Sequence, residues 1–194
     1  MRYNQIRECD IANGEGIGVA LFVQGCHFHC KNCFNPETWD FNGGKEWTPE
    51  VEDKFIELAS RPYIKRISLL GGECLADENL DGILNLVNRI RLLFGNSKSI
   101  WLYTGYKTVG IKNDLWLLEP NIITDKVLEP KELATGISNV EKRSEIIKKC
   151  DTLVDGRYID SQKDISLKWR GSSNQRVIAI QKSLQKGEIV LWSD

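Results

Sequence analysis

The stretch GVALFVQGCHFHCKNC, residues 18–33, joins a short apolar run directly to three closely spaced cysteines. Its first part, Gly18–Gln24, is a continuous apolar run of the kind found in strands buried on both faces of a parallel sheet. Cys26, Cys30 and Cys33 follow where that strand ends. In a reducing compartment, such a tight group of cysteines indicates a metal site or catalysis rather than disulfide bonds.

The segments beyond this stretch alternate between helical and strand-like patterns. Thr48 and Pro49 suit a helix N-cap and first helical position, and predict a helix that ends near Ser60. Apolar residues recur with helical spacing over residues 80–94. Short apolar runs predict further strands at Arg66–Leu70, Ser99–Tyr103 and Thr152–Val154. The alternation predicts an α/β fold with a parallel sheet, either doubly wound or a complete or partial barrel.

The least regular region covers residues 107–149, and we expect part of it to be an insertion. It holds a candidate strand at Ile122–Thr124 and a charged helix near Val140–Lys149. No repeat, low-complexity tract or linker divides the chain. Residues 1–194 are therefore expected to form a single domain.

Two apolar runs near the C-terminus have the composition of strands. They are Arg176–Ile180 and Glu188–Trp192. Such runs predict a last pair of strands. The second would belong to a C-terminal strand extension around residues 181–194.

The charge and hydropathy of the chain argue against two classes of partner. Twenty-six basic and 27 acidic residues give a net charge of −1. That balance provides no field for binding nucleic acid or a membrane surface. The apolar run Val19–Val23 is far shorter than the ~20 residues of a membrane span, and the charged N-terminus lacks the apolar region of a secretory signal. We expect a cytoplasmic protein.

Candidate functional groups follow four of the predicted strands. In parallel α/β folds, ligands bind at the carboxyl ends of the strands, where loops from separate strands meet. The cysteines follow the first strand. The later strands are followed by GGE at Gly71, Gly72 and Glu73, by TGY beginning at Thr104, and by Asp155 with Gly156. All four loops are expected on one rim.

The cysteine spacing is compatible with more than one metal. Thiolates at positions i, i+4 and i+7 can hold three corners of an iron–sulphur cubane and leave the fourth iron open for a substrate. His27 and His29 lie between the cysteines and could instead complete a Cys₃His zinc site, although no second ligand pair of the zinc-finger type is present. Reduced structural cysteines are the third reading.

Several motifs together resemble those of a known family. The sequence resembles radical S-adenosylmethionine enzymes, and among them the activating proteins of anaerobic ribonucleotide reductases. The resemblance rests on the C-x3-C-x2-C pattern with the segments DIANGEG (10–16), FNPETW (34–39), GGE (71–73), WLYTGY (101–106), LVDGRYI (153–159) and WRGSSNQR (169–176). It implies an incomplete parallel (β/α) barrel of the radical S-adenosylmethionine type, which the alternation alone did not select.

The resemblance also implies an activity and its cofactors. Cys26, Cys30 and Cys33 would hold one [4Fe–4S] cluster per chain. The reduced cluster would cleave S-adenosylmethionine to methionine and a 5′-deoxyadenosyl radical. That radical would generate a glycyl radical on an anaerobic ribonucleotide reductase. A low-potential donor such as flavodoxin would supply the electron.

The resemblance implies roles for residues of the GGE loop. Glu73 would bind the ammonium group of S-adenosylmethionine. Gly71 and Gly72 would let the backbone approach the substrate without a Cβ clash. This chain has Cys74 where the family commonly has Pro, and we expect a buried apolar thiol there rather than a fourth ligand.

Other positions carry weaker expectations. Phe34 would stack on the adenine ring, with packing as an equal alternative. Thr104 and Asp155 would contact the substrate, or in the case of Asp155 a nearby cation, although an Asp-Gly pair is also a common turn. Residues 170–175 precede a strand, so we assign them no catalytic part. His27 and His29 are expected beside the cluster rather than on it.

Two other functions remain as alternatives. A small-molecule radical enzyme such as a deazapurine synthase would share the cluster and S-adenosylmethionine. A zinc-binding interaction module would have no catalytic activity. Iron content and colour separate the module from both enzymes.

Overall fold

The computed structural model describes residues 1–112, 115–119 and 138–192. The strands in these ranges are β1 (Arg2–Asp10), β2 (Gly18–Val23), β3 (Lys45–Glu46), β4 (Arg66–Gly71), β5 (Ser99–Tyr103), β6 (Thr108–Lys112), β7 (Leu115–Leu118), β8 (Thr152–Asp155) and β9 (Arg176–Ala179). The helices are α1 (Pro49–Ser60), α2 (Leu80–Phe94), α3 (Asn139–Lys148) and α4 (Ile180–Lys186), with short 3-10 turns at Pro36–Thr38 and Asp160–Gln162.

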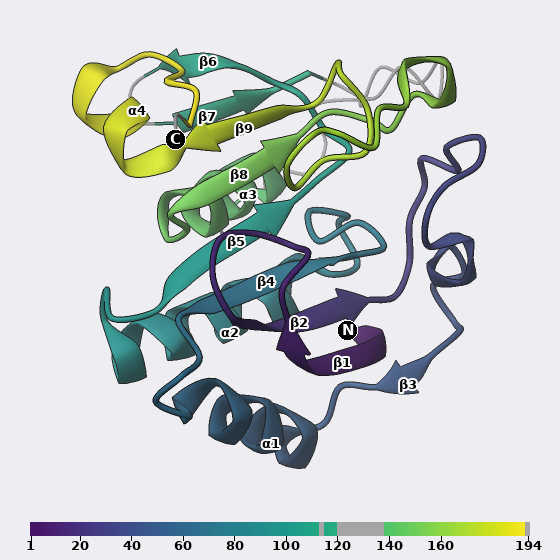
Figure 1. The fold of residues 1–194 in the computed structure, drawn as a ribbon. Helices are drawn as coiled ribbons and strands as arrows, with labels where there is room; N and C mark the ends of the chain where they lie inside the picture. The colour runs from purple at the N-terminus through teal and green to yellow at the C-terminus, as the bar shows by residue number, and fades with distance from the viewer. Residues whose placement is uncertain (113–114, 120–137, 193–194) are drawn as a thin grey trace.

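One mixed sheet forms the centre of the molecule (Figure 1). Among the described residues its strands lie in the order β3-β1-β2-β4-β5-β8-β9. The middle neighbours β2, β4, β5 and β8 are parallel, whereas β1, β3 and β9 pair antiparallel at the two sides. The α/β class and the parallel centre are confirmed. The antiparallel outer strands were not part of the expected parallel arrangement.

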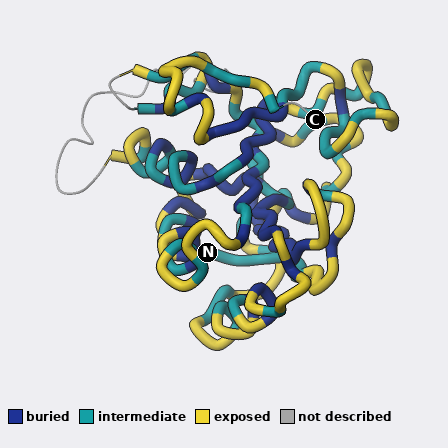
Figure 2. Tube along the Cα trace, turned by 60° about the vertical axis from the view of Figure 1, so that its left-hand side comes forward, coloured by how far each residue is buried: buried dark blue, intermediate teal, exposed yellow. Residues whose placement is uncertain are grey.

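The helices α1, α2 and α3 cover one face of this sheet. Side chains of β2 alternate between the two faces, as the two-residue period of a strand requires. Val19, Leu21 and Val23 join the main core together with residues such as Phe55 of α1 and Ile83 of α2. Figure 2 shows the central strands buried and the surrounding loops largely exposed.

The opposite face of the sheet carries two smaller apolar clusters. Ala20, Phe22 and Leu70 form one, and Trp101 and Val154 belong to the other. The helices of the main core do not contribute to either cluster. This face is therefore the wall of the sheet that remains available to a ligand.

Most elements predicted from periodicity are confirmed. The structure contains the five strands predicted to begin at residues 18, 66, 99, 152 and 176 and both long helices, α1 and α2. Thr48 accepts a hydrogen bond from the Val51 amide, which confirms its role as the α1 N-cap. The predicted charged helix near residues 140–149 is α3, whose N-terminus is a capping box of Ser138 and Glu141.

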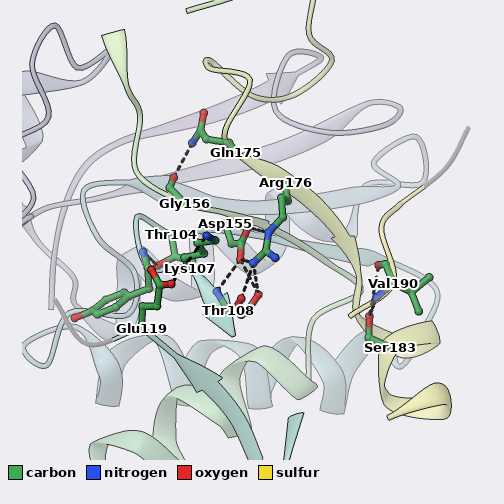
Figure 3. A network of polar contacts seen from close by, with 11 residues as sticks. Thr104, Lys107, Thr108, Glu119, Asp155, Gly156, Gln175, Arg176, Ser183 and Val190 are labelled. Atoms are coloured by element: carbon green, nitrogen blue, oxygen red, sulfur yellow. Dashed lines mark hydrogen bonds and ion pairs between the residues drawn. The ribbon is translucent and has the colours of Figure 1, made fainter. Parts of the chain in front are cut away.

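The C-terminal strand prediction was wrong. Residues 180–186 form α4 rather than a strand extension, and Glu188–Trp192 contributes only one isolated bridge, between Leu191 and Ile178. Ser183 explains the turn of the chain. Its hydroxyl donates to the Ala179 carbonyl at 2.8 Å, which stabilises the helix start. The same hydroxyl accepts from the Val190 amide at 2.9 Å and so fixes the returning segment (Figure 3).

The region 107–149 holds more regular structure than expected. Strands β6 and β7 form an antiparallel hairpin, and α3 packs beside it. The predicted strand at Ile122–Thr124 lies outside the described residues. No helix in the described part of the chain is both long and apolar enough to cross a membrane.

Candidate functional site

A cavity of about 530 Å³ lies on the open face of the sheet. Its walls include Phe22, Leu70, Tyr103 and Val154, which come from the four central strands. The carboxyl ends of the parallel strands and the loops that follow them form much of the remaining lining. The cavity therefore lies at the edge where the sequence predicted a ligand.

The loop after β2 brings all three clustered cysteines to this cavity. Cys26, Cys30 and Cys33 line it, and each is partly buried. The start of the loop is fixed by a hydrogen bond from the Cys26 amide to the Trp39 carbonyl at 3.0 Å. The Cys33 amide donates to the Cys30 carbonyl at 3.1 Å, which turns the loop between the second and third cysteines.

The environment of Cys26 favours the protonated thiol when no metal is bound. Burial, with a further contribution from the Glu73 carboxylate, raises the pKa of Cys26 to about 12. A positively charged metal centre reverses this preference, because a coordinated thiol loses its proton. Metal binding at Cys26 would therefore release a proton.

The remaining cysteines lie elsewhere. Cys9 is exposed, and Cys74 and Cys150 are fully buried in the main core. The expectation of a buried apolar thiol at position 74 is confirmed. In the described residues no three Cys, His, Asp or Glu side chains converge closely enough to hold a single metal ion. A cubane is larger than one ion, and three thiols around a cavity fit the donor set that it requires.

The two histidines of the loop point to other partners. His27 Nε2 lies 3.0 Å from Glu78 Oε1, and its ring packs on Phe41. His29 packs on the Trp39 ring with centroids 4.7 Å apart. Neither histidine is among the residues that line the cavity.

Glu73 is a buried carboxylate at the cavity wall. Its side chain is held by three donors. Oε1 accepts from the Leu75 amide at 2.8 Å and the Thr104 hydroxyl at 2.7 Å, and Oε2 accepts from the Gly105 amide at 2.7 Å. Burial raises the pKa of Glu73, and these hydrogen bonds with the charge of Arg143 oppose that rise. One acceptor position on Oε2 remains for a ligand.

Gly71 and Gly72 line the cavity beside Glu73, and both positions require glycine. Gly71 has φ +106°, and a Cβ there would lie 2.7 Å from the Phe22 Cα. A Cβ on Gly72 would lie 2.4 Å from the Gly25 carbonyl oxygen. The two glycines therefore let the GGE loop pack directly against the start of the cysteine loop.

Thr104 and Phe34 also line the cavity. The Thr104 hydroxyl donates to Glu73 and accepts from the Tyr106 amide at 3.1 Å. Phe34 is 60% exposed and meets Tyr158 edge to face, with ring centroids 5.0 Å apart. The Lys163 ammonium lies over the same ring, 5.6 Å from its centroid.

Asp155 does not line the cavity, unlike the other predicted residues. Its side chain is buried, and both oxygens are occupied (Figure 3). Arg176 binds the two oxygens, with Nε 2.9 Å from Oδ1, and Oδ2 also accepts from the amide and hydroxyl of Thr108 at 2.8 and 2.6 Å. This network joins β8 and β9 to the β6–β7 hairpin. Asp155, Arg176 and Thr108 are all absent from the cavity lining.

The segment before β9 lies at the cavity, which the sequence did not indicate. Residues 170–175 were assigned no catalytic part because they precede a strand, yet Arg170, Gly171 and Gln175 line the cavity. Gln175 Oε1 accepts from the Gly171 amide at 2.9 Å, and its Nε2 donates to the Gly156 carbonyl at 2.9 Å (Figure 3). Because β9 runs antiparallel to β8, its beginning lies at the carboxyl end of the parallel strands.

The sequence reasoning also gave no role to three further residues of the cavity. Arg7, Asn13 and Tyr103 line it without an assigned role. Asn13 is fixed because Asp10 accepts from its amide at 2.9 Å, and Asp10 forms a buried ion pair with Arg66 Nη2 at 2.8 Å. The segment DIANGEG carried the family resemblance, and it was the available signal for Asn13.

Comparison with known families defines the class of protein. Residues 12–178 match the model of a family described as a 4Fe-4S single cluster domain. The match includes the three cavity cysteines and the loops after β4, β5 and β8.

Individual relatives define the family more narrowly. An anaerobic ribonucleoside-triphosphate reductase-activating protein of Vibrio cholerae is 36% identical over 177 residues, which cover 90% of this chain and 96% of the relative. The protein of that name from Escherichia coli K12 is 39% identical over 179 residues (91% and 97%), and that of phage T4 is 33% identical over 179 residues (91% and 93%). This chain belongs to the family of anaerobic ribonucleoside-triphosphate reductase-activating proteins.

Proposed function

We propose that this chain activates an anaerobic ribonucleotide reductase by cleaving S-adenosylmethionine at a [4Fe–4S] cluster. One observation carries the proposal: three thiols and a buried carboxylate, brought by loops distant in sequence, line the same cavity at the strand ends. The family to which the chain belongs supports a 4Fe-4S cluster and a reductase as its target.

The cluster would be held by Cys26, Cys30 and Cys33. When bound and reduced, it would supply the electron that breaks the sulphonium bond of S-adenosylmethionine, giving methionine and a 5′-deoxyadenosyl radical. Three protein thiolates leave one iron without a protein ligand, and that iron would be open to the substrate. The protein contributes orientation and protection from water.

Glu73 would bind the substrate ammonium group through the acceptor position that remains on Oε2. Thr104 and the Gly105 amide would keep the carboxylate aimed at the cavity, since both already hydrogen-bond to it. A charge-assisted hydrogen bond of this kind is stronger than one between neutral groups. The substrate cation would also offset the cost of the buried negative charge.

Phe34, Gly71 and Gly72 would form the rest of the substrate site. The exposed ring of Phe34 offers a surface for adenine, and the two glycines allow close approach of the backbone. We assign no substrate contact to Asp155, because Arg176 and Thr108 occupy its oxygens.

A glycine of the reductase would be the hydrogen donor. A glycine has no side chain to keep its Cα from the radical carbon, and the resulting radical is delocalised over the flanking amides. We further propose that the curved sheet is an incomplete barrel whose open face admits a protein segment. In the cytoplasm, a low-potential donor such as flavodoxin would supply the electron for the cluster.

Anaerobic reconstitution tests this function. The protein should become brown with ~4 Fe per chain and, with a reductant, convert S-adenosylmethionine to methionine and 5′-deoxyadenosine. A colourless protein with one tightly bound zinc would support the interaction module instead. Conversion of a small purine precursor, with no effect on a reductase, would support the synthase.

A further inference from the structure

The segment after β8 crosses the cysteine loop and is hydrogen-bonded to it on both sides of Cys30. Arg157 Nη2 donates to the Phe28 carbonyl at 2.9 Å, within the interval between Cys26 and Cys30. Asn32 Nδ2 donates to Asp160 Oδ2 at 2.9 Å, directly before the third cysteine. Two residues of one segment thus hold both intervals of the C-x3-C-x2-C pattern.

Side-chain packing strengthens this connection. The Arg157 guanidinium lies over the Phe28 ring, 5.3 Å from its centroid. The Tyr158 hydroxyl donates to Asp160 Oδ1 at 3.0 Å, which orients that carboxylate toward the loop. The Tyr158 ring also meets Phe34, just beyond the last cysteine.

The crossing segment is itself fixed by the residues before β9. Asn174 Nδ2 donates to the Arg157 carbonyl at 2.8 Å, and Gln175 Nε2 donates to the Gly156 carbonyl at 2.9 Å. The Ile159 amide donates to the Ser172 hydroxyl at 3.2 Å. The motif WRGSSNQR, to which the proposed chemistry gives no role, therefore supports the backbone that restrains the cysteines.

The cysteine loop needs such restraint because parts of its backbone are strained. His29 has φ +44° and Asn32 has φ +54°, in the left-handed region that non-glycine residues seldom occupy. Such conformations persist only where the surrounding structure holds them. The hydrogen bond from Asn32 to Asp160 acts directly at one of these residues.

We propose that Arg157 and Asp160 are positioning residues that hold the cysteine loop in its cluster-binding shape before the cluster arrives. Ser172, Asn174 and Gln175 hold these two residues in turn. The proposal rests on the assignment of the cluster to the three cavity cysteines, but not on substrate cleavage or on the reductase. The positioning role can therefore be wrong while the proposed function is right. It can also be right if substrate cleavage or the reductase target proves wrong.

Amide hydrogen exchange of the metal-free protein tests the proposal. Arg157→Ala and Asp160→Ala should each speed exchange in residues 28–32 roughly two- to tenfold, the range of a net hydrogen bond, and the double variant should exceed both. Exchange in α2 should not change, which shows that the fold is intact. Arg157→Lys should restore part of the protection. Arg61→Ala is the matched control, because Arg61 pairs with Glu8 at the opposite end of the strands.

A second measurement uses the reconstituted protein. The double variant should release iron to a chelator several-fold faster, and the reduction potential of its cluster should shift, because hydrogen bonding and solvent exposure set that potential. Arg157→Lys should return the potential toward the wild-type value. Exchange, iron release and potential equal to those of Arg61→Ala would overturn the proposal. If the double variant fails to fold, the single variants decide it by the same comparison.

Discussion

The Thr104 hydroxyl donates a 2.7 Å hydrogen bond to the Glu73 carboxylate and so joins the loops that follow two neighbouring parallel strands. Both side chains are buried at the cavity wall. Burying a carboxylate in this position is unfavourable in free energy unless hydrogen-bond donors or positive charges pair with its oxygens. Its three protein donors leave one acceptor position, and that position is where we place the substrate ammonium group.

Replacement of Glu73 should separate substrate binding from cluster binding. Glu73→Ala should retain iron but weaken S-adenosylmethionine binding by ~1.5–3 kcal/mol, the value of a charged hydrogen bond. Anaerobic titration monitored by the cluster's absorption measures the affinity. Glu57→Ala on the exposed face of α1 is a control expected to match the wild type. Unchanged affinity in Glu73→Ala would remove the assigned role.

Single cysteine substitutions should divide the six thiols into two groups. Cys26→Ala, Cys30→Ala and Cys33→Ala should each lose the stable cluster, because two thiolates do not hold a cubane. Ala substitutions at the exposed Cys9 and the buried Cys150 should retain it. Iron analysis and the visible spectrum measure the outcome. A full cluster in any of the first three variants would contradict the ligand assignment.

Cys74 is a separate case, because it directly follows Glu73 of the GGE loop. It is fully buried in the main core. Cys74→Ala should therefore keep the cluster and lower the free energy of unfolding by only ~1 kcal/mol, as a small loss of buried volume does. Loss of the cluster in a folded Cys74→Ala protein would instead show that this thiol binds iron.

The ion pair of Asp10 and Arg66 should set part of the acid stability. Burial alone would raise the pKa of Asp10, but hydrogen bonds from Asn13 and Arg66 outweigh it and lower that pKa below its ordinary value of 3.8. The contribution of Asp10 to the free energy of unfolding is therefore present above its pKa in the unfolded chain. It is lost as the pH falls through its pKa in the folded protein. Asp10→Asn should cost ~3–5 kcal/mol at neutral pH and remove this part of the acid dependence.

Urea unfolding between neutral pH and about pH 3 measures this contribution. The exposed Asp53, which pairs with Arg89 on the surface, gives the control. Asp53→Asn should change stability by less than ~1 kcal/mol. Equal losses in the two variants would contradict a special role for the buried pair.

Asp155 should act on stability rather than on substrate affinity. Asp155→Asn should lower the free energy of unfolding by ~3 kcal/mol, because it removes the buried charge that pairs with Arg176 and replaces one of the two acceptor oxygens by an NH₂ donor. S-adenosylmethionine affinity should stay within twofold of the wild type, roughly the scatter of an uninvolved site. Thermal unfolding and substrate titration distinguish a structural role of Asp155 from a substrate-binding role. A tenfold weaker affinity with unchanged stability would return Asp155 to the substrate site.

The central strands and the cysteine loop could be predicted because their local sequence signals agree with the fold. Gly18–Val23 is buried along its length, so its apolar run has no competing interpretation. Strand β1 was missed because it is a polar, half-exposed sequence, RYNQIRECD, whose strand form comes from pairing with β2. Tertiary pairing of this kind leaves no clear period in the sequence.

The cavity could be predicted only in part, for a similar reason. Gly71, Gly72, Glu73 and Thr104 follow parallel strands, and a general rule places them at the rim. Asp155 satisfies the same rule, but its neighbour Arg176 on an antiparallel strand binds it. The position of that strand depends on long-range pairing, which also brings residues 170–175 to the cavity.

The most direct test of the central claim is electron paramagnetic resonance of the reductase after activation. The reconstituted protein, S-adenosylmethionine and a reductant would be mixed anaerobically with the cognate anaerobic ribonucleotide reductase. The account predicts a stable doublet on the reductase that collapses to a single line when its glycines are deuterated at Cα, and ribonucleotide reduction only after the doublet appears. Cleavage of S-adenosylmethionine with a reductase that stays free of radical and inactive would contradict it.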